Sequence, residues 1–262
     1  MSPWSRFKHF KPSAATSCRR LAGHSFNLVL LVLLGCWLPT TAPAAESSAL
    51  IVIGLSPSAD DASEFLSLAA KAKSALVERG FAESRVEILH EKVTRELILQ
   101  KLRAVTLSTN DEFWLVLLGF NGRAADGSPA FQVSGPRLTA PVLRAALDGI
   151  PARQFIYLGL GNGGNFIPEL KRDHRTILSG TQAEGEPDVP RFTQAWLTEF
   201  AKTPHADLAE VAVRAAKQID EDYTVKKMAQ TEHACLFDPA SGQVLAPPFE
   251  IKPPDTNAPA AK

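Results

Sequence analysis

Several short runs of this chain are almost wholly apolar, and they alternate with longer segments of helical periodicity. The clearest runs are Ala49–Leu55, Phe113–Leu118 and Phe155–Leu158, in which β-branched and aromatic residues are frequent. A strand buried on both faces has this pattern, whereas a strand with one solvent face alternates apolar and polar residues. Strands buried on both faces belong to parallel sheets covered by helices, so this feature restricts the chain to an α/β fold.

Helical segments lie between these runs. Residues 60–79 carry apolar side chains at helical spacing, and Gly80 follows as a helix-ending residue. Thr94 is a suitable N-cap for a second helix that reaches Val105. Further helices are expected at 140–147, 192–200 and 208–221, and further strands at 85–89 and 176–178. The alternation predicts a three-layer sandwich with a mainly parallel central sheet.

Right-handed crossovers place the carboxyl ends of the parallel strands at one edge of the sheet, where α/β folds hold their ligand and catalytic sites. Two strand-end loops there are rich in glycine and asparagine. Residues 119–123 have the sequence Gly-Phe-Asn-Gly-Arg, and residues 159–166 have the sequence Gly-Leu-Gly-Asn-Gly-Gly-Asn-Phe. We expect the functional site to lie in these two loops.

The order of these segments resembles the caspase/legumain clan of cysteine peptidases. In that clan the third strand ends in a Gly-His-Gly loop, an Asp-Gly hairpin follows, and the fourth strand ends in the loop that bears the nucleophilic cysteine. The matching parts here are residues 119–123, Asp126-Gly127 and residues 159–166, and residues 231–234 (Thr-Glu-His-Ala) look like a late segment of bacterial legumain-like members. The resemblance covers residues 49–245 and implies a caspase-like α/β sandwich.

The resemblance breaks at the two catalytic positions, because the clan's histidine falls on Asn121 and its cysteine on Gly161. An amide does not titrate near neutral pH and glycine has no nucleophile, whereas the peptidase mechanism needs a thiolate beside an imidazole. The resemblance therefore implies a catalytically degenerate member, a pseudo-peptidase whose cleft serves as a peptide- or protein-binding or scaffold module. The binding residues that it implies are Asn121, Gly122, Arg123, Asn162, Gly163 and Asn165.

Two alternative functions remain open. His233 and Cys235 lie two apart, as on one face of a strand, so an active hydrolase with non-standard residues is one alternative. The pattern Gly159-x-Gly161-x-x-Gly164 fits a turn that binds a dinucleotide pyrophosphate, so nucleotide binding is the other. The histidines of the domain are scattered without paired-ligand spacing, and we predict neither a metal nor another cofactor.

The N-terminus has the composition of an export signal. Residues 1–26 contain five basic and no acidic residues, residues 28–38 are almost wholly apolar, and Ala42-Pro43-Ala44 has small residues where a signal peptidase reads them. We expect cleavage after Ala44 and a periplasmic or extracellular product. Leu33-Leu34-Gly35-Cys36 has the form of a lipobox, so lipidation of Cys36 is an alternative. The apolar core is shorter than the roughly twenty residues of a spanning helix, although a retained anchor stays open.

The charge balance changes when this segment is removed. The full chain has 28 basic and 28 acidic residues, so 23 basic and 28 acidic residues remain, a net charge of about −5. This balance argues against a nucleic-acid partner. Cys235 is then the one cysteine left, which excludes an internal disulfide. We expect one domain over residues 45–252 without a transmembrane span, and a disordered Pro/Ala-rich tail over residues 253–262.

Overall fold

The computed structural model describes residues 46–182, 185–187 and 190–250. The predicted export segment at 1–44, with Cys36, and the predicted tail at 253–262 lie outside the described residues. All described residues belong to one compact unit that comprises residues 45–262.

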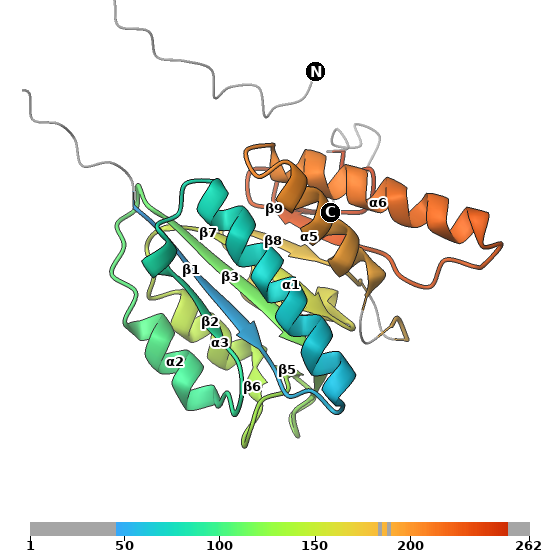
Figure 1. Ribbon diagram of the computed structural model, residues 1–262. Helices are drawn as coiled ribbons and strands as arrows, with labels where there is room; N and C mark the ends of the chain where they lie inside the picture. Colours follow the sequence, from blue (N-terminus) through green and yellow to red (C-terminus); the bar gives the residue numbers. More distant parts are fainter. Residues whose placement is uncertain (1–45, 183–184, 188–189, 251–262) are drawn as a thin grey trace, which may run out of the picture. The chain divides into compact units, whose positions relative to one another are not determined.

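A seven-stranded sheet forms the middle layer of this unit, in the order β10-β9-β8-β7-β3-β1-β2 (Figure 1). Five neighbouring strands of this sheet, β2, β1, β3, β7 and β8, run parallel. In contrast, β9 is antiparallel to β8, and β10 is antiparallel to β9. The predicted fold class, an α/β sandwich with a mainly parallel central sheet, is confirmed. The strands are β1 (Ser47–Ile53), β2 (Val86–Leu89), β3 (Glu112–Gly119), β7 (Arg153–Leu160), β8 (Arg175–Ser179), β9 (Cys235–Asp238) and β10 (Gln243–Leu245).

The three most apolar runs of the sequence form adjacent strands of this sheet. Leu117 of β3 lies opposite Val52 of β1 and Leu158 of β7 on the face covered by α2 and α3, and none of these three side chains is exposed. Its neighbour Val116 is only 1% exposed on the face covered by α1 and α5. Burial on both faces explains why these strands lack polar alternation.

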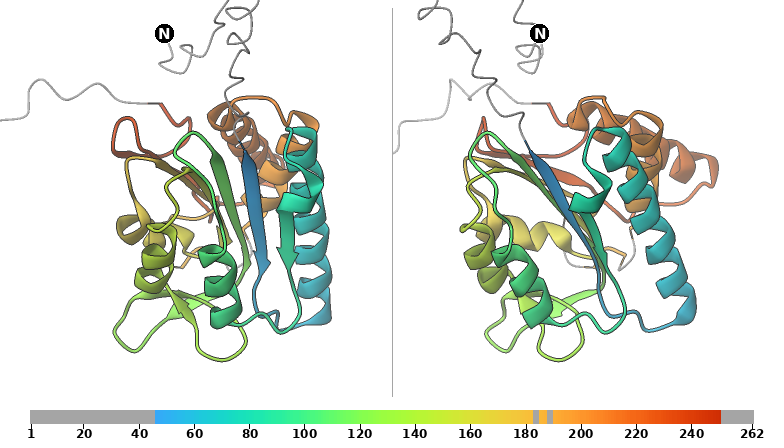
Figure 2. Two further views of the ribbon diagram at one scale, coloured as in Figure 1. Left: turned by 90° about the vertical axis from the view of Figure 1, so that its left-hand side faces the viewer. Right: turned by 60° about the vertical axis from the view of Figure 1, so that its left-hand side comes forward.

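Helices cover both faces of the sheet, which Figure 2 shows edge-on. One face packs against α1, α5 and α6, and the other packs against α2, α3 and the short α4. Aromatic rings fill the first interface: Trp114 stacks on Phe200 at 5.3 Å, and Trp196 stacks on Tyr157 at 4.5 Å. The helices are α1 (Ala59–Glu78), α2 (Arg95–Arg103), α3 (Ala140–Leu147), α4 (Ile167–Leu170), α5 (Arg191–Lys202) and α6 (Leu208–Val225).

The helix ends follow local sequence signals. The Thr94 side chain accepts a hydrogen bond from the Leu97 N–H at 3.2 Å, which confirms the predicted N-cap of α2. Gly80 follows the end of α1 with a φ of +112°, a conformation that favours glycine. Several predicted boundaries differ from the structure. Arg85 belongs to the 3₁₀ turn Glu83–Arg85, so β2 begins one residue later. The helix α2 ends at Arg103 rather than at Val105, and α6 ends at Val225, four residues beyond the predicted end.

A small antiparallel sheet extends the carboxyl edge of the main sheet (Figure 2). It contains β4 (Asn121–Arg123), β5 (Pro129–Phe131) and β6 (Leu138–Thr139). The predicted Asp-Gly hairpin joins β4 to β5, with Gly127 at a φ of +80°. The main chain ties this sheet to β1, because the Leu55 N–H donates to the Gln132 oxygen at 2.9 Å. A Cβ on Gly54 would lie 2.5 Å from that oxygen, so this close approach requires glycine.

Within the described part of the chain, none of the helices combines the length and the apolar character that crossing a bilayer requires.

The position of β3 gives a stability prediction. Leu117→Asp places an unpaired charge where no water reaches, so we expect it to lower the free energy of unfolding by at least about 3 kcal/mol. Val244→Asp makes the same type of change in β10 at a side chain that is 50% exposed, and it should change stability by less than about 0.5 kcal/mol. Urea denaturation followed by circular dichroism measures both. Equal effects of the two substitutions would contradict the assignment of Leu117 to the core.

Candidate functional site

The loops that follow β3 and β7 lie at the same edge of the sheet. Gly119 pairs with Leu160 in the ladder between these neighbouring strands. Asn121 comes two residues after Gly119, and Gly161 comes directly after Leu160. The register therefore brings Asn121 and Gly161, the two positions at which the family resemblance places a histidine and a cysteine, to adjacent strand ends.

Asn121, Gly122 and Arg123 form β4, and hydrogen bonds within the small sheet fix their main chain. The Gln132 side-chain amide donates to the main-chain oxygen of Asn121 at 2.6 Å, and the Arg137 guanidinium donates to the main-chain oxygen of Arg123. The Arg123 side chain itself donates to the Gly127 oxygen at 2.8 Å. Arg123 thus reaches across its own hairpin turn, while the half-buried Asn121 begins the strand.

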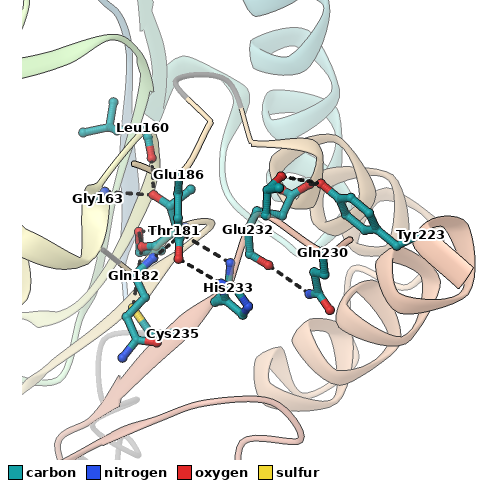
Figure 3. Close-up of polar contacts among 12 residues, drawn as sticks. Leu160, Gly163, Thr181, Gln182, Glu186, Tyr223, Gln230, Glu232, His233 and Cys235 are labelled. Atoms are coloured by element: carbon teal, nitrogen blue, oxygen red, sulfur yellow. Dashed lines mark hydrogen bonds and ion pairs between the residues drawn. The ribbon is translucent and has the colours of Figure 1, made fainter. Parts of the chain in front are cut away.

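The loop after β7 is held by Thr181, as Figure 3 shows for Gly163. The Thr181 hydroxyl accepts from the Gly163 N–H at 2.9 Å and donates to the Leu160 oxygen at 2.7 Å. The main-chain oxygen of Thr181 accepts from the Gly164 N–H at 2.9 Å. A Cβ on Gly163 would lie 2.4 Å from the Ser179 hydroxyl, so close packing explains this glycine. A phosphate would need the same N–H groups, so the loop geometry does not favour nucleotide binding.

Two asparagine side chains stand on this loop. Asn162 has a left-handed backbone, with a φ of +51°, and Asn165 lies in the 3₁₀ turn Gly163–Phe166. The Asn162 side-chain oxygen is buried, and no described group donates a hydrogen bond to it. A buried acceptor without a partner is uncommon in folded proteins and costs free energy. The candidate site therefore contains an unsatisfied hydrogen-bonding group at the predicted position.

Cys235 and His233 do not form a catalytic pair. The Cys235 side chain is buried, its thiol donates to the Thr181 oxygen at 3.7 Å, and burial together with the nearby Glu186 carboxylate raises its pKa to about 12. His233 precedes β9, is 54% exposed, and its Nδ1 contacts a Glu186 oxygen at 3.0 Å instead (Figure 3). A nucleophilic cysteine needs a lowered pKa and a base hydrogen-bonded to its thiol, whereas the pKa of Cys235 is raised and its thiol donates to a main-chain oxygen.

Glu186 connects the loop after β8 with the segment before β9. Its carboxylate accepts the Gln182 N–H at 2.8 Å and the His233 N–H at 3.2 Å, in addition to the contact with the imidazole (Figure 3). The side chain is only 9% exposed. No local pattern identifies this residue, because a glutamate between Gly185 and Pro187 has the sequence context of an exposed loop.

Glu232 is a second buried carboxyl group that the sequence analysis did not assign. It accepts the Phe192 N–H at 2.9 Å and the Tyr223 hydroxyl at 3.1 Å, and so it links the start of α5 and the end of α6 to the β9 segment. Burial raises its pKa, although both hydrogen bonds favour the charged form. No local pattern in residues 231–234 indicates that this acidic residue is buried.

No group of three or more histidine, cysteine, aspartate and glutamate side chains is arranged to hold a metal ion among the residues that the structure describes.

No family model and no curated protein matches this chain. Solved structures with a similar arrangement include caspase-1 from Spodoptera frugiperda, which is 12% identical, with 73% of this chain and 86% of that chain covered and a TM-score of 0.47. The structure of pro-sf-caspase-1 is 15% identical, with 74% and 91% covered and the same TM-score of 0.47. These similarities concern the arrangement of helices and strands, and they assign neither an activity nor a site residue to this chain.

The buried Glu232 predicts a pH-dependent stability. Because its folded-state pKa is raised, its contribution to stability is fully present below the unfolded-state pKa and declines as the pH rises through the folded-state pKa. Glu232→Gln removes this titration, so the stability of the wild type relative to the variant should fall as the pH rises above the ordinary pKa of a glutamate. Urea denaturation at several pH values measures the difference.

Glu221→Gln provides the control, because Glu221 is 63% exposed on the neighbouring α6. The difference between this variant and the wild type should change little with pH. A difference for Glu232→Gln that rises with pH would contradict the burial of an ionisable group at this position.

Proposed function

We propose that this chain is an exported, non-catalytic domain of the caspase/legumain type, a pseudo-peptidase that binds a peptide or protein segment at the carboxyl edge of its sheet. One observation carries the proposal. The loops after β3 and β7 are built and held in position, but they present an amide at Asn121 and no side chain at Gly161. A site of this kind can hold a chain without transferring a proton or forming a covalent bond.

The state of Cys235 supports the absence of peptidase chemistry. Its thiol is buried against the main-chain oxygen of Thr181, and the His233 imidazole contacts the Glu186 carboxylate. A pKa of about 12 leaves roughly one thiol in 10⁵ ionised at pH 7. The alternative of an active hydrolase of the cysteine-peptidase type would need this group as its nucleophile, because the described domain has no other cysteine.

The amides at the edge support binding of a main chain. An asparagine side chain donates and accepts hydrogen bonds, as the peptide group of a bound segment does. Asn121, Asn162 and Asn165 stand on two loops that Gln132 and Thr181 hold through main-chain groups. Preorganised donors and acceptors lower the entropy cost of binding, so this arrangement suits recognition of an extended segment.

Export is supported by the N-terminal pattern of basic residues, apolar core and Ala42-Pro43-Ala44. Cleavage after Ala44 would release the domain into the periplasm or the medium, and lipidation of Cys36 would tether it to a membrane instead. Either product leaves Cys235 as the one cysteine of the folded domain.

The proposal predicts an unreactive cysteine. Native protein at pH 7 should react with a thiol reagent such as dithionitrobenzoate at least a hundredfold more slowly than the same protein in urea, because both burial and the raised pKa suppress attack. The Cys235→Ala variant gives the background for both states. Cleavage of peptide substrates by the wild type, lost in Cys235→Ala, would show that the domain is a peptidase.

Peptide binding is tested by selection from a random heptapeptide display library, with fluorescence anisotropy on the enriched peptides. Asn121→Ala and Asn165→Ala should each weaken binding about fivefold, which corresponds to one hydrogen bond of about 1 kcal/mol. Asn110→Ala is the matched control, since Asn110 is exposed just before β3 at the opposite edge of the sheet. Mass spectrometry should recover the bound peptides intact. Failure to enrich any peptide, or equal binding by the Asn121/Asn165 double variant, would refute the proposed function.

A further inference from the structure

A cavity of about 160 Å³ opens at the carboxyl ends of β1 and β2, on the same edge of the sheet as the candidate site. Its apolar walls are Ile53, Leu55, Ala62, Leu66 and Val93. The first turns of α1 form one side, and the connection from β2 to α2 forms the other. We call it the apolar cavity.

Two side chains of the apolar cavity are exposed to an unusual degree for leucine. Leu55 is 51% exposed and Leu66 is 42% exposed, and both stand among the few large apolar side chains that the described surface leaves in water. An apolar group that entered the cavity would remove part of both side chains from water, which is favourable in proportion to the area covered. The surface is therefore suited to an apolar occupant.

The wall opposite α1 has a constrained backbone. Glu91 and Lys92 have consecutive positive φ values of 58° and 52°, a conformation that non-glycine residues rarely adopt. The connection between β5 and β6 of the small antiparallel sheet holds this wall in place. In this connection, the Ser134 N–H donates to the main-chain oxygen of Val93 at 2.8 Å, and Ser134 forms a β-bridge with Thr94. Strained backbone of this kind persists where the surroundings fix it, and it is enriched at ligand-binding sites.

Size and charge define the occupant. An apolar cavity of roughly 150 Å³ accepts a group the size of benzene, whereas whole small-molecule ligands usually occupy 300 Å³ or more. The charges at the rim cancel, because Glu91 and Lys92 are adjacent and of opposite sign, and His90 lies 3.9 Å from the Glu91 carboxylate. An aliphatic side chain fits this cavity in both size and charge.

We propose that the apolar cavity receives one aliphatic side chain (Leu, Ile or Met) of the extended peptide segment that binds at this edge. The strand order β7-β3-β1-β2 places the cavity two to three strand spacings from Gly161, which is about 12 Å, or about four residues of extended chain. The segment therefore carries its aliphatic residue three or four positions from the residue that faces Asn121 and Gly161. The inference rests on the proposed function for the peptide, but the cavity can be tested separately.

The test is a nuclear magnetic resonance titration of the purified ¹⁵N-labelled chain with N-acetyl-leucine amide. Saturable shifts should appear at the main-chain amides of Leu55, Leu66 and Val93. N-acetyl-alanine amide and N-acetyl-aspartate amide should bind at least tenfold more weakly, because one is too small and the other is charged.

Ala62→Leu fills the apolar cavity from α1 and should abolish these shifts. Ala70→Leu is the matched control, because Ala70 is an exposed residue on the same helix and does not line the cavity. Melting temperatures verify that both variants are folded. If Ala62→Leu does not fold, Leu66→Ser at the rim serves in its place and should weaken binding at least fivefold. The absence of shifts in the wild type, equal shifts with the aspartate amide, or unchanged binding in the cavity variants would overturn the inference.

The peptide library separates this inference from the proposed function. Enriched peptides that share an aliphatic residue at the stated spacing, and that lose affinity in Ala62→Leu, support the inference. Enriched peptides without such a residue, bound equally by Ala62→Leu, overturn it and leave the proposed function intact. A library that yields no peptide, together with specific binding of the leucine amide, refutes the proposed function and supports the cavity as an aliphatic site.

Discussion

Burial of β1, β3 and β7 on both faces is the constraint on which the rest of the structure depends. These strands contain side chains without exposed surface on both faces, such as Leu117 and Leu158 on one face and Ile51 and Tyr157 on the other, so helices must cover both sides of the sheet. Connections through helices make the strands parallel, and parallel strands end at one edge. The two glycine-rich loops, the small antiparallel sheet and the apolar cavity all lie at this edge for the same reason.

Buried polar groups then set the positions of the loops. Thr181 binds both sides of the turn after β7, and Glu186 and Glu232 join the β8–α5 region to the segment before β9. Buried polar groups are costly without partners, so these hydrogen bonds favour the observed positions of the loops. The same network confines Cys235, whose thiol contacts the Thr181 oxygen. Cys235 is thereby part of the buried scaffold.

The proposed recognition function rests on the groups that this edge presents. Asn121 supplies an amide that does not titrate, and the loop after β7 uses its N–H groups internally. The apolar cavity lies along the same edge, between α1 and the strained backbone at Glu91 and Lys92. The proposed binding of an extended peptide rests on these neutral hydrogen-bonding groups together with the apolar cavity.

The sequence by itself determined the α/β class, the three central strands, the Thr94 cap, the Asp-Gly hairpin and the lack of a His–Cys pair at residues 121 and 161, because local periodicity and residue type carry this information. Only the tertiary structure decided the contacts of Glu186, the burial of Glu232, the different exposure of His233 and Cys235, and the existence of the apolar cavity. These features arise where segments distant in the chain meet. Burial and pKa depend on such contacts, and no local pattern encodes them.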